Sequence, residues 1–248
     1  MMLTIELIFM MLGYLDFPDV IRFAISNKKL YSTLQKTRMP IYWKNDTSDL
    51  KLFSEYKNDL EGTIRDIRSE LVRICFTFIR KTSKQYIFGG FVRDSIAGVP
   101  WHDIDICSVS TRTRFMRLFE YIKNSLPKFV NVTYKTSLQY LNNFTVKKII
   151  ISVNHIKITS IDYVYFKNIP LKRVKVDYDV NTLFTDGEQI GSMLVRRHGY
   201  KEKMPWEVIE EISTNIRNKH ACPISREANG HQPIHRVLKM MNKGFKVY

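Results

Sequence analysis

The sequence has no long apolar run and few cysteines. No hydrophobic stretch in its 248 residues approaches the roughly 20 that a membrane-spanning helix needs, and the first residues lack the basic start and small-residue cleavage site of a signal peptide. The three cysteines, Cys75, Cys107 and Cys222, follow neither a zinc-module nor a disulfide spacing. These absences predict an intracellular protein, cytoplasmic or nuclear, with no membrane partner and with all three cysteines as reduced core thiols.

Acidic residues are also in short supply. The chain has 39 Lys and Arg against 24 Asp and Glu, which gives a formal net charge of +15. Residues 1–50 hold six basic and five acidic side chains, so the rest of the chain carries a net charge of +14. Such an excess is typical of a protein with a polyanionic partner, either nucleic acid or nucleotide. A lysine-rich surface that is merely solvated is the alternative.

Residues 1–45 have the pattern of a small helical module. Apolar residues stand at helical spacing on both sides of Pro18, which cannot donate the backbone hydrogen bond of a helix interior. The order of four short segments resembles an F-box, with Thr4 in place of the family's proline: 3–7, 11–15, 19–22 and 26–30. The resemblance implies a Skp1-type partner bound through residues 3–34. A helical cap that only shields the next domain is the alternative.

The rest of the chain predicts a linker at 46–60 and one α+β domain at 61–248. Apolar residues recur every three or four positions through 59–80, which predicts an amphipathic helix. The other expected elements are a strand at 86–88, a helix at 111–125, and strands near 131–134, at 144–153 and at 156–165. Together they predict a mixed β-sheet flanked by helices.

A glycine pair directly follows the strand expected at 86–88. Gly89 and Gly90 let the backbone approach a ligand closely, and a helix opening at 92–94 would direct free amide groups at a phosphate. Asp103 and Asp105 then alternate with isoleucines, so that a strand would place both carboxylates on one face, about 7 Å apart. Because magnesium takes few carboxylate oxygens beside water and substrate phosphate, this segment predicts a nucleotide and metal site.

The same segment carries a family resemblance. Residues 89–106, GGFVRDSIAGVPWHDIDI, resemble the signature of the polymerase-β-like nucleotidyltransferase superfamily, in the branch of CCA-adding enzymes and bacterial poly(A) polymerases. The resemblance implies a nucleotidyltransferase fold and transfer of a nucleoside monophosphate from an NTP to a hydroxyl, with an RNA or tRNA 3′ end as the expected acceptor. The implied cofactor of this two-metal mechanism is Mg²⁺ or Mn²⁺.

The resemblance also implies roles for individual residues. Asp103 and Asp105 would bind the metals, Gly89 and Gly90 would contact the triphosphate, and two further residues would shape the nucleotide pocket: Arg93 and Asp94.

Two downstream segments extend the resemblance. Residues 177–183 are similar to the stretch that lines ribose and triphosphate in the family, which implies nucleotide binding by Asp177 and Asn181, although a lysine and a valine replace the family's paired arginines. The segment that begins at Arg236 is similar to the helix after the catalytic head, which implies that this arginine also contacts the nucleotide. A Gln-Pro pair replaces the family's Glu-Asp before it.

A third carboxylate is commonly needed on a neighbouring strand, as a base toward the incoming hydroxyl. Asp162 is the candidate, because apolar residues flank it as in the broader superfamily. In the CCA-adding pattern the acidic position falls instead at Lys157, and a polar residue at a strand end is the alternative for Asp162. These departures support a second hypothesis: an F-box adaptor of a Skp1-type ubiquitin ligase whose catalytically silent nucleotidyltransferase fold recognises a target.

Overall fold

The computed structural model describes residues 60–82, 85–108, 113–140, 144–166, 176–187, 189–195, 200–224 and 234–248. The F-box-like module expected at 1–45 and nearly all of the linker expected at 46–60 lie outside these residues, so the module and its Skp1-type partner stay predictions. The described part has an α+β fold in which helices flank a mixed sheet, which confirms the predicted fold class. No helix within the described ranges has the length and apolar character to cross a membrane.

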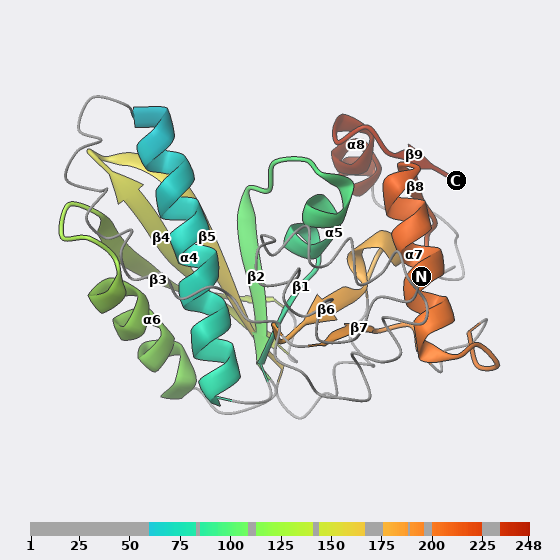
Figure 1. The fold of residues 1–248 in the computed structure, drawn as a ribbon, viewed down its shortest axis with the longest axis horizontal. Coiled ribbons are helices and arrows are strands. Elements are labelled where there is room, and N and C mark those ends of the chain that lie inside the picture. The colour runs from blue at the N-terminus through green and yellow to red at the C-terminus, as the bar shows by residue number, and fades with distance from the viewer. Residues whose placement is uncertain are drawn as a thin grey trace, which may run out of the picture. The chain divides into compact units, whose positions relative to one another are not determined.

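The elements carry the labels of Figure 1. The helices are α4 (Leu60–Thr82), α5 (Gly90–Ala97), α6 (Thr113–Ser125), α7 (Pro205–Arg217), α8 (Ile234–Asn242) and the 3-10 helix η3 (Asp179–Asn181). The strands are β1 (Gln85–Phe88), β2 (Asp103–Ser108), β3 (Asn131–Tyr140), β4 (Phe144–Val153), β5 (Ile156–Phe166), β6 (Leu183–Thr185), β7 (Ile190–Ser192), β8 (His220–Ala221) and β9 (Lys246–Val247). The sequence therefore places the principal elements correctly, and β3 exceeds its predicted length because it pairs with β4 as far as Tyr140.

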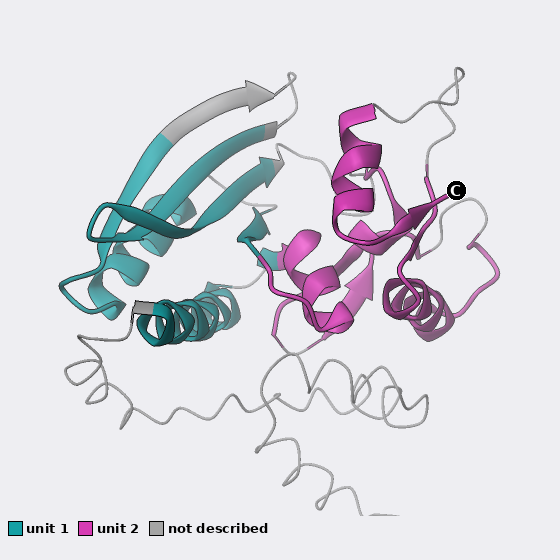
Figure 2. Ribbon diagram, turned by 90° about the horizontal axis from the view of Figure 1, so that it is seen from above, with its two compact units in different colours: residues 1–15, 41–86, 102–167 teal, residues 16–40, 87–101, 168–248 magenta. Residues whose placement is uncertain are grey.

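The chain divides into two compact units, which Figure 2 colours separately. Among the described residues, the first unit holds α4, α6 and strands β2 to β5, and the second holds α5, α7, α8, η3 and strands β6 to β9. Strand β1 belongs to both, because Gln85 and Tyr86 lie in the first unit while Ile87 and Phe88 lie in the second. Each unit is described by itself below.

The first unit is a twisted sheet with helices on one side. Its hydrogen-bonded strand order is β3-β4-β5-β2-β1, and β2 runs parallel to β5 while β4 runs antiparallel to both β3 and β5. Helices α4 and α6 lie on the same side of strands β3 to β5 (Figures 1 and 2). The side chains facing these helices include Tyr134 and Tyr163, whose rings pack edge-on against Phe115 of α6.

The opposite face of this sheet carries a row of charged side chains, and it also includes Ile150 and the buried Ser160. Four charged residues are in register across neighbouring strands. Asp105 on β2 pairs with Asp162 on β5, Asp162 pairs with Lys148 on β4, and Lys148 pairs with Lys135 on β3. Neither described helix of the unit lies on this surface. We use the name open face for seven of its residues: Asp103, Asp105, Thr133, Lys135, Lys148, Ile150 and Asp162. All seven side chains are half-buried or exposed.

Helix α4 follows the predicted periodicity. Ile67, Leu71, Ile74, Cys75 and Phe78 are buried on one side, and Ile64, at the start of the series, is half-buried. An acidic residue in the first turn and two basic residues in the last suit the helix dipole. The helix thus forms where an amphipathic pattern and favourable ends coincide.

The second unit surrounds the short helix α5. Strand β6 pairs antiparallel with both β1 and β7, and α5 packs against α7, β6 and η3. The last residues of the chain return to this unit, where β9 pairs in parallel with β8.

The three cysteines do not share one environment. Cys75 and Cys107 are buried free thiols, as predicted, but Cys222 is exposed, so its prediction as a core thiol is wrong. The main chain of Cys222 is fixed by Asp179, which accepts a hydrogen bond from its amide and donates one to its carbonyl.

Candidate functional site

Strand β2 positions the two carboxylates that the sequence singled out. Ile104 and Ile106 are fully buried, whereas Asp103 and Asp105, which alternate with them, are half-buried on the open face. Alternation on a strand therefore brings both aspartates to the same side, as predicted.

Asp162 belongs to the same surface. In the parallel pairing of β2 with β5, Asp162 stands in register with Asp105, and Ser160 with Asp103. Residues in register on neighbouring strands direct their side chains to the same face, and the strands lie about 4.8 Å apart. Three aspartates from two adjacent strands therefore lie on one side of the sheet. The structure brings these three predicted residues together within the first unit.

A lysine from the next strand engages Asp162. The ammonium group of Lys148 on β4 lies 3.0 Å from Oδ1 of Asp162, and the two side chains are 38% and 20% exposed. Within the described residues, no three or more His, Cys, Asp or Glu side chains are grouped as a metal would require. The carboxylates of Asp103 and Asp105, which are half-buried on one face of β2, nevertheless fit magnesium or manganese, because Mg²⁺ commonly uses one or two protein carboxylates beside substrate phosphates.

The glycine turn lies in the second unit, between β1 and α5. Gly89 is buried with φ of 70° and ψ of −128°, a positive-φ conformation that favours glycine. Its amide donates to the carbonyl of Leu183 on β6. Because glycine is the N-cap, α5 has no side-chain cap, and the N-terminus of the helix carries the positive end of its dipole. The helix begins at Gly90, two residues earlier than predicted.

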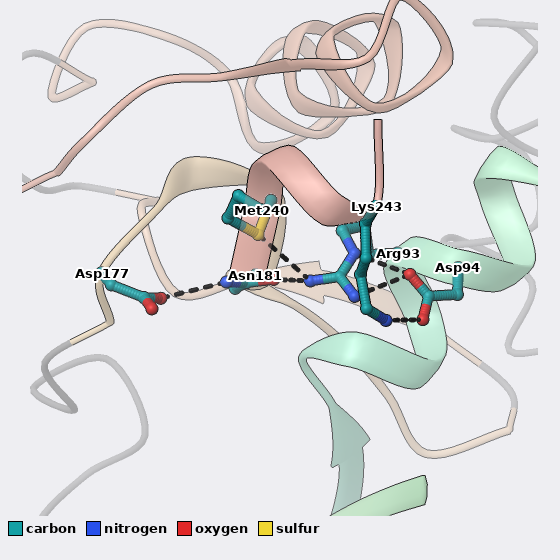
Figure 3. Close-up of polar contacts among 6 residues, drawn as sticks. All are labelled: Arg93, Asp94, Asp177, Asn181, Met240 and Lys243. Carbon is teal, nitrogen blue, oxygen red and sulfur yellow. Dashed lines mark hydrogen bonds and ion pairs between the residues drawn. The ribbon is translucent and has the colours of Figure 1, made fainter. Parts of the chain in front are cut away.

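Beyond the turn, a buried network links Arg93 and Asp94 to the rest of the unit (Figure 3). Arg93 is only 3% exposed, and its guanidinium donates to Oδ1 of Asp94 at 2.7 Å and to Oδ1 of Asn181 at 2.5 Å. Asn181 in turn donates from Nδ2 to Oδ1 of Asp177 at 3.0 Å. The Nη1 group of Arg93 also lies 3.7 Å from the sulfur of Met240.

The network ends on a charged residue of α8. Arg236, which is 50% exposed, places Nη1 at 3.6 Å from Oδ2 of Asp177. Five residues that the sequence singled out, Arg93, Asp94, Asp177, Asn181 and Arg236, are therefore connected through direct contacts. The buried members hold one another in place, and Arg236 and the half-buried Asp177 are the members that reach the surface.

Sequence reasoning missed three members of these groups. Lys243 donates to the other oxygen of Asp94 at 2.5 Å, Met240 touches Arg93, and Lys148 pairs with Asp162. Lys243 and Met240 lie in the segment that resembles the family's helix, but nothing in their local sequence identifies a partner. For Lys148 the sequence gives only its position in an alternating strand. That position predicts the side of the sheet on which the lysine lies, but not its ion pair with Asp162.

Comparisons with known proteins were made for the whole chain. No family model and no curated protein matches it. Among solved structures it is similar to a CCA-adding enzyme in complex with CTP, at 16% identity and a TM-score of 0.44, over 88% of this chain and 43% of that chain. It is also similar to the Thermotoga maritima CCA-adding enzyme complexed with tRNA_CCA, at 17% identity and a TM-score of 0.45, over 73% of this chain and 39% of that chain.

A third similar structure is the Bacillus stearothermophilus CCA-adding enzyme in complex with CTP, at 16% identity and a TM-score of 0.39, over 73% of this chain and 41% of that chain. The chain thus spans less than half the length of these three proteins. The structural neighbours named here are CCA-adding enzymes, at low identity and with partial coverage, and this similarity assigns no role to any residue.

Proposed function

We propose that this protein is a metal-dependent nucleotidyltransferase that moves a nucleoside monophosphate from an NTP to a hydroxyl of RNA. The observation that carries the proposal is the placement of Asp103 and Asp105 on one face of β2, with Asp162 in register with Asp105 on β5. This face is on the side of the sheet away from α4 and α6 (Figures 1 and 2), and all three carboxylates are half-buried there.

In this proposal Asp103 and Asp105 hold Mg²⁺ or Mn²⁺ through carboxylate oxygens. The bound ions would neutralise charge on the attacking and leaving oxygens of the displacement. The half-buried side chains of Asp103 and Asp105 supply the small number of protein oxygens that Mg²⁺ favours. The NTP phosphates would be further ligands.

The glycine turn of the second unit would bind phosphate. Gly89 has no Cβ to obstruct an anion, and the N-terminus of α5, which has no side-chain cap, presents the positive end of the helix dipole. Arg93 and Asp94 would act on this turn indirectly, because their charged groups are bonded within the protein. Asp177 and Arg236 reach the surface and would contact the nucleotide itself.

Asp162 would accept the proton of the acceptor hydroxyl. The acceptor oxygen forms a bond to the α-phosphorus of the NTP, the bond from this phosphorus to the bridging oxygen breaks, and pyrophosphate leaves. A carboxylate must be free of its ion pair to receive a proton, so Lys148 would have to move away from Asp162 in the active complex.

RNA is proposed as the acceptor because of charge and resemblance. The net charge of +14 outside the first 50 residues favours a polyanion, and the glycine and aspartate signature resembles that of enzymes that extend RNA 3′ ends.

Transfer of labelled nucleotide to bulk RNA tests the proposal. The protein is incubated with each labelled NTP in turn and with Mg²⁺, and Asp103→Asn and Asp105→Asn are compared with the parent. Each change should reduce incorporation about 100-fold or more, because it removes several kcal/mol of charge stabilisation at the metal. Asp66→Asn on α4 is the matched control and should keep parental activity. Incorporation that persists in both site variants would refute the proposal.

A further inference from the structure

We propose that Lys135 and Lys148 form a binding site for the phosphate backbone of the RNA acceptor, on the open face beside the carboxylates. The identity of this ligand as the acceptor rests on the proposed function, whereas the site itself rests on the contacts of β3, β4 and β5. The site would position RNA and take no part in bond formation.

Strand register sets the two lysines in a row. Lys148 on β4 stands opposite Asp162 on β5 on one side and opposite Lys135 on β3 on the other. With strands spaced about 4.8 Å apart, the row leads away from the carboxylates across two strands. A chain whose 3′ end lies at the aspartates could therefore place successive phosphates along it.

The pairing of the lysines is unfavourable by itself. Like charges directly opposite each other on an antiparallel pair destabilise a sheet, and Lys135 and Lys148 occupy such a position. Asp162 offsets one of the two positive charges. A phosphate bound between the lysines would offset the remaining one, and this charge complementarity favours a polyanionic occupant over an apolar or cationic one.

Both lysines are accessible from the same side. Lys135 is exposed and the Lys148 side chain is 38% exposed. Thr133, one position along the same face of β3, is exposed as well and offers a hydroxyl for a further phosphate contact. By contrast, Lys147 points to the helix side, where its ammonium lies 4.7 Å from the centre of the Phe115 ring.

Single-stranded RNA binding in the absence of NTP and metal tests the site. Fluorescence anisotropy of a labelled RNA oligonucleotide is measured at several salt concentrations for the full-length parent and for Lys135→Gln/Lys148→Gln. The control is Lys123→Gln/Lys128→Gln, which removes the same charge from exposed residues in and just after α6, on the helix side. Circular dichroism and thermal melting check that each variant folds.

The expected result is binding at least about 10-fold weaker at low salt in the open-face double variant. The slope of log affinity against log salt should become shallower by about 1.4, since each lost contact to single-stranded RNA removes about 0.7. The control should keep the parental slope. The single variant Lys135→Gln preserves the Lys148–Asp162 ion pair. Its slope should change by about half as much as the slope of the double variant.

Three outcomes would overturn this inference: parental affinity in the open-face variant, equal weakening in both double variants, or no RNA binding by the parent. The inference would also be overturned if the open-face double variant lost affinity for NTP but kept its affinity for RNA. The lysines would then bind the nucleotide and not the acceptor. This binding assay needs no catalysis, so its outcome is independent of the transfer assay. The lysine variants could bind RNA normally while Asp103→Asn abolishes transfer, or they could lose RNA binding while Asp103→Asn has no effect on transfer.

Discussion

Lys243 donates a hydrogen bond of 2.5 Å to Oδ2 of Asp94, a residue 149 positions earlier in the chain. The other oxygen of this carboxylate is held by Arg93, so the 1% exposed side chain of Asp94 has a cationic partner at each oxygen. A buried carboxylate requires such compensation. The residue just after α8 therefore completes the environment of the helix that follows the glycine turn.

Replacing Lys243 should destabilise the fold. We expect Lys243→Met to lower the free energy of unfolding by about 1.5–3 kcal/mol, because one oxygen of a buried carboxylate loses its charged partner while Arg93 still holds the other. Urea denaturation measures the change. Lys239→Met, at an exposed position in the last turn of α8, should change it by less than about 1 kcal/mol. Equal effects of the two changes would contradict this prediction.

The two glycines of the turn should respond differently to alanine. Gly89 has φ of 70°, so Gly89→Ala should lower the free energy of unfolding by about 1–3 kcal/mol. At Gly90 an added Cβ would meet only Nη2 of Arg93, at an ordinary 3.6 Å. Gly90→Ala should therefore be neutral or stabilising by up to about 1 kcal/mol. Chemical denaturation of both variants checks the contrast, and a more harmful change at Gly90 would refute it.

Asp179 should make stability depend on pH. Burial raises the pKa of this carboxyl, even though Asn215 and the amides of Cys222 and Val180 donate hydrogen bonds to it. Above the ordinary value near 4 and up to the raised value, the folded protein binds more protons at this site than the unfolded chain. The contribution of Asp179 to the free energy of unfolding therefore falls as pH rises through this window.

Asp179→Asn removes this titration. The difference in unfolding free energy, parent minus variant, should decrease as pH rises from below 4 and become constant above the raised pKa. Urea denaturation of both proteins across this pH range measures it. A difference that does not change with pH would show that the carboxyl titrates alike in the folded and unfolded chain.

Cys222 should be the one thiol that reacts in the native protein. It is exposed, while Cys75 and Cys107 are buried, and partial desolvation still raises its pKa. Ellman's reagent should modify one thiol per native chain and three after denaturation. The native reaction should accelerate as pH rises toward 9, because the thiolate is the nucleophile. Cys222→Ser should abolish the native reaction, and modification of two or more thiols in the folded parent would contradict the prediction.

Local pattern was enough to predict the principal elements and the face on which the central carboxylates lie. The alternation of Asp103 and Asp105 with isoleucines specifies a strand with two aspartates on one side, and burial follows that pattern. The three- to four-residue repeat likewise predicts α4. Both succeed because side-chain direction in a strand or helix is fixed by residues close in sequence.

Partnership between distant residues could not be predicted in the same way. The register of β4 against β5 decides that Lys148 meets Asp162, and the return of the chain after α8 decides that Lys243 meets Asp94. The contacts of Arg93 with Asn181 and Met240 are likewise set by segments far along the chain, and its role beside a nucleotide stays a prediction.

The sequence by itself therefore determined which residues share a face and which turn needs glycine, since these follow from backbone geometry over a few residues. Only the tertiary structure decided which charges are neutralised inside the protein and which stay accessible, because a charge is paired or left in solvent by segments that approach it from far along the chain. That distinction separates the buried network around Arg93 from the open face, where Lys135 is exposed and Lys148 is paired with Asp162.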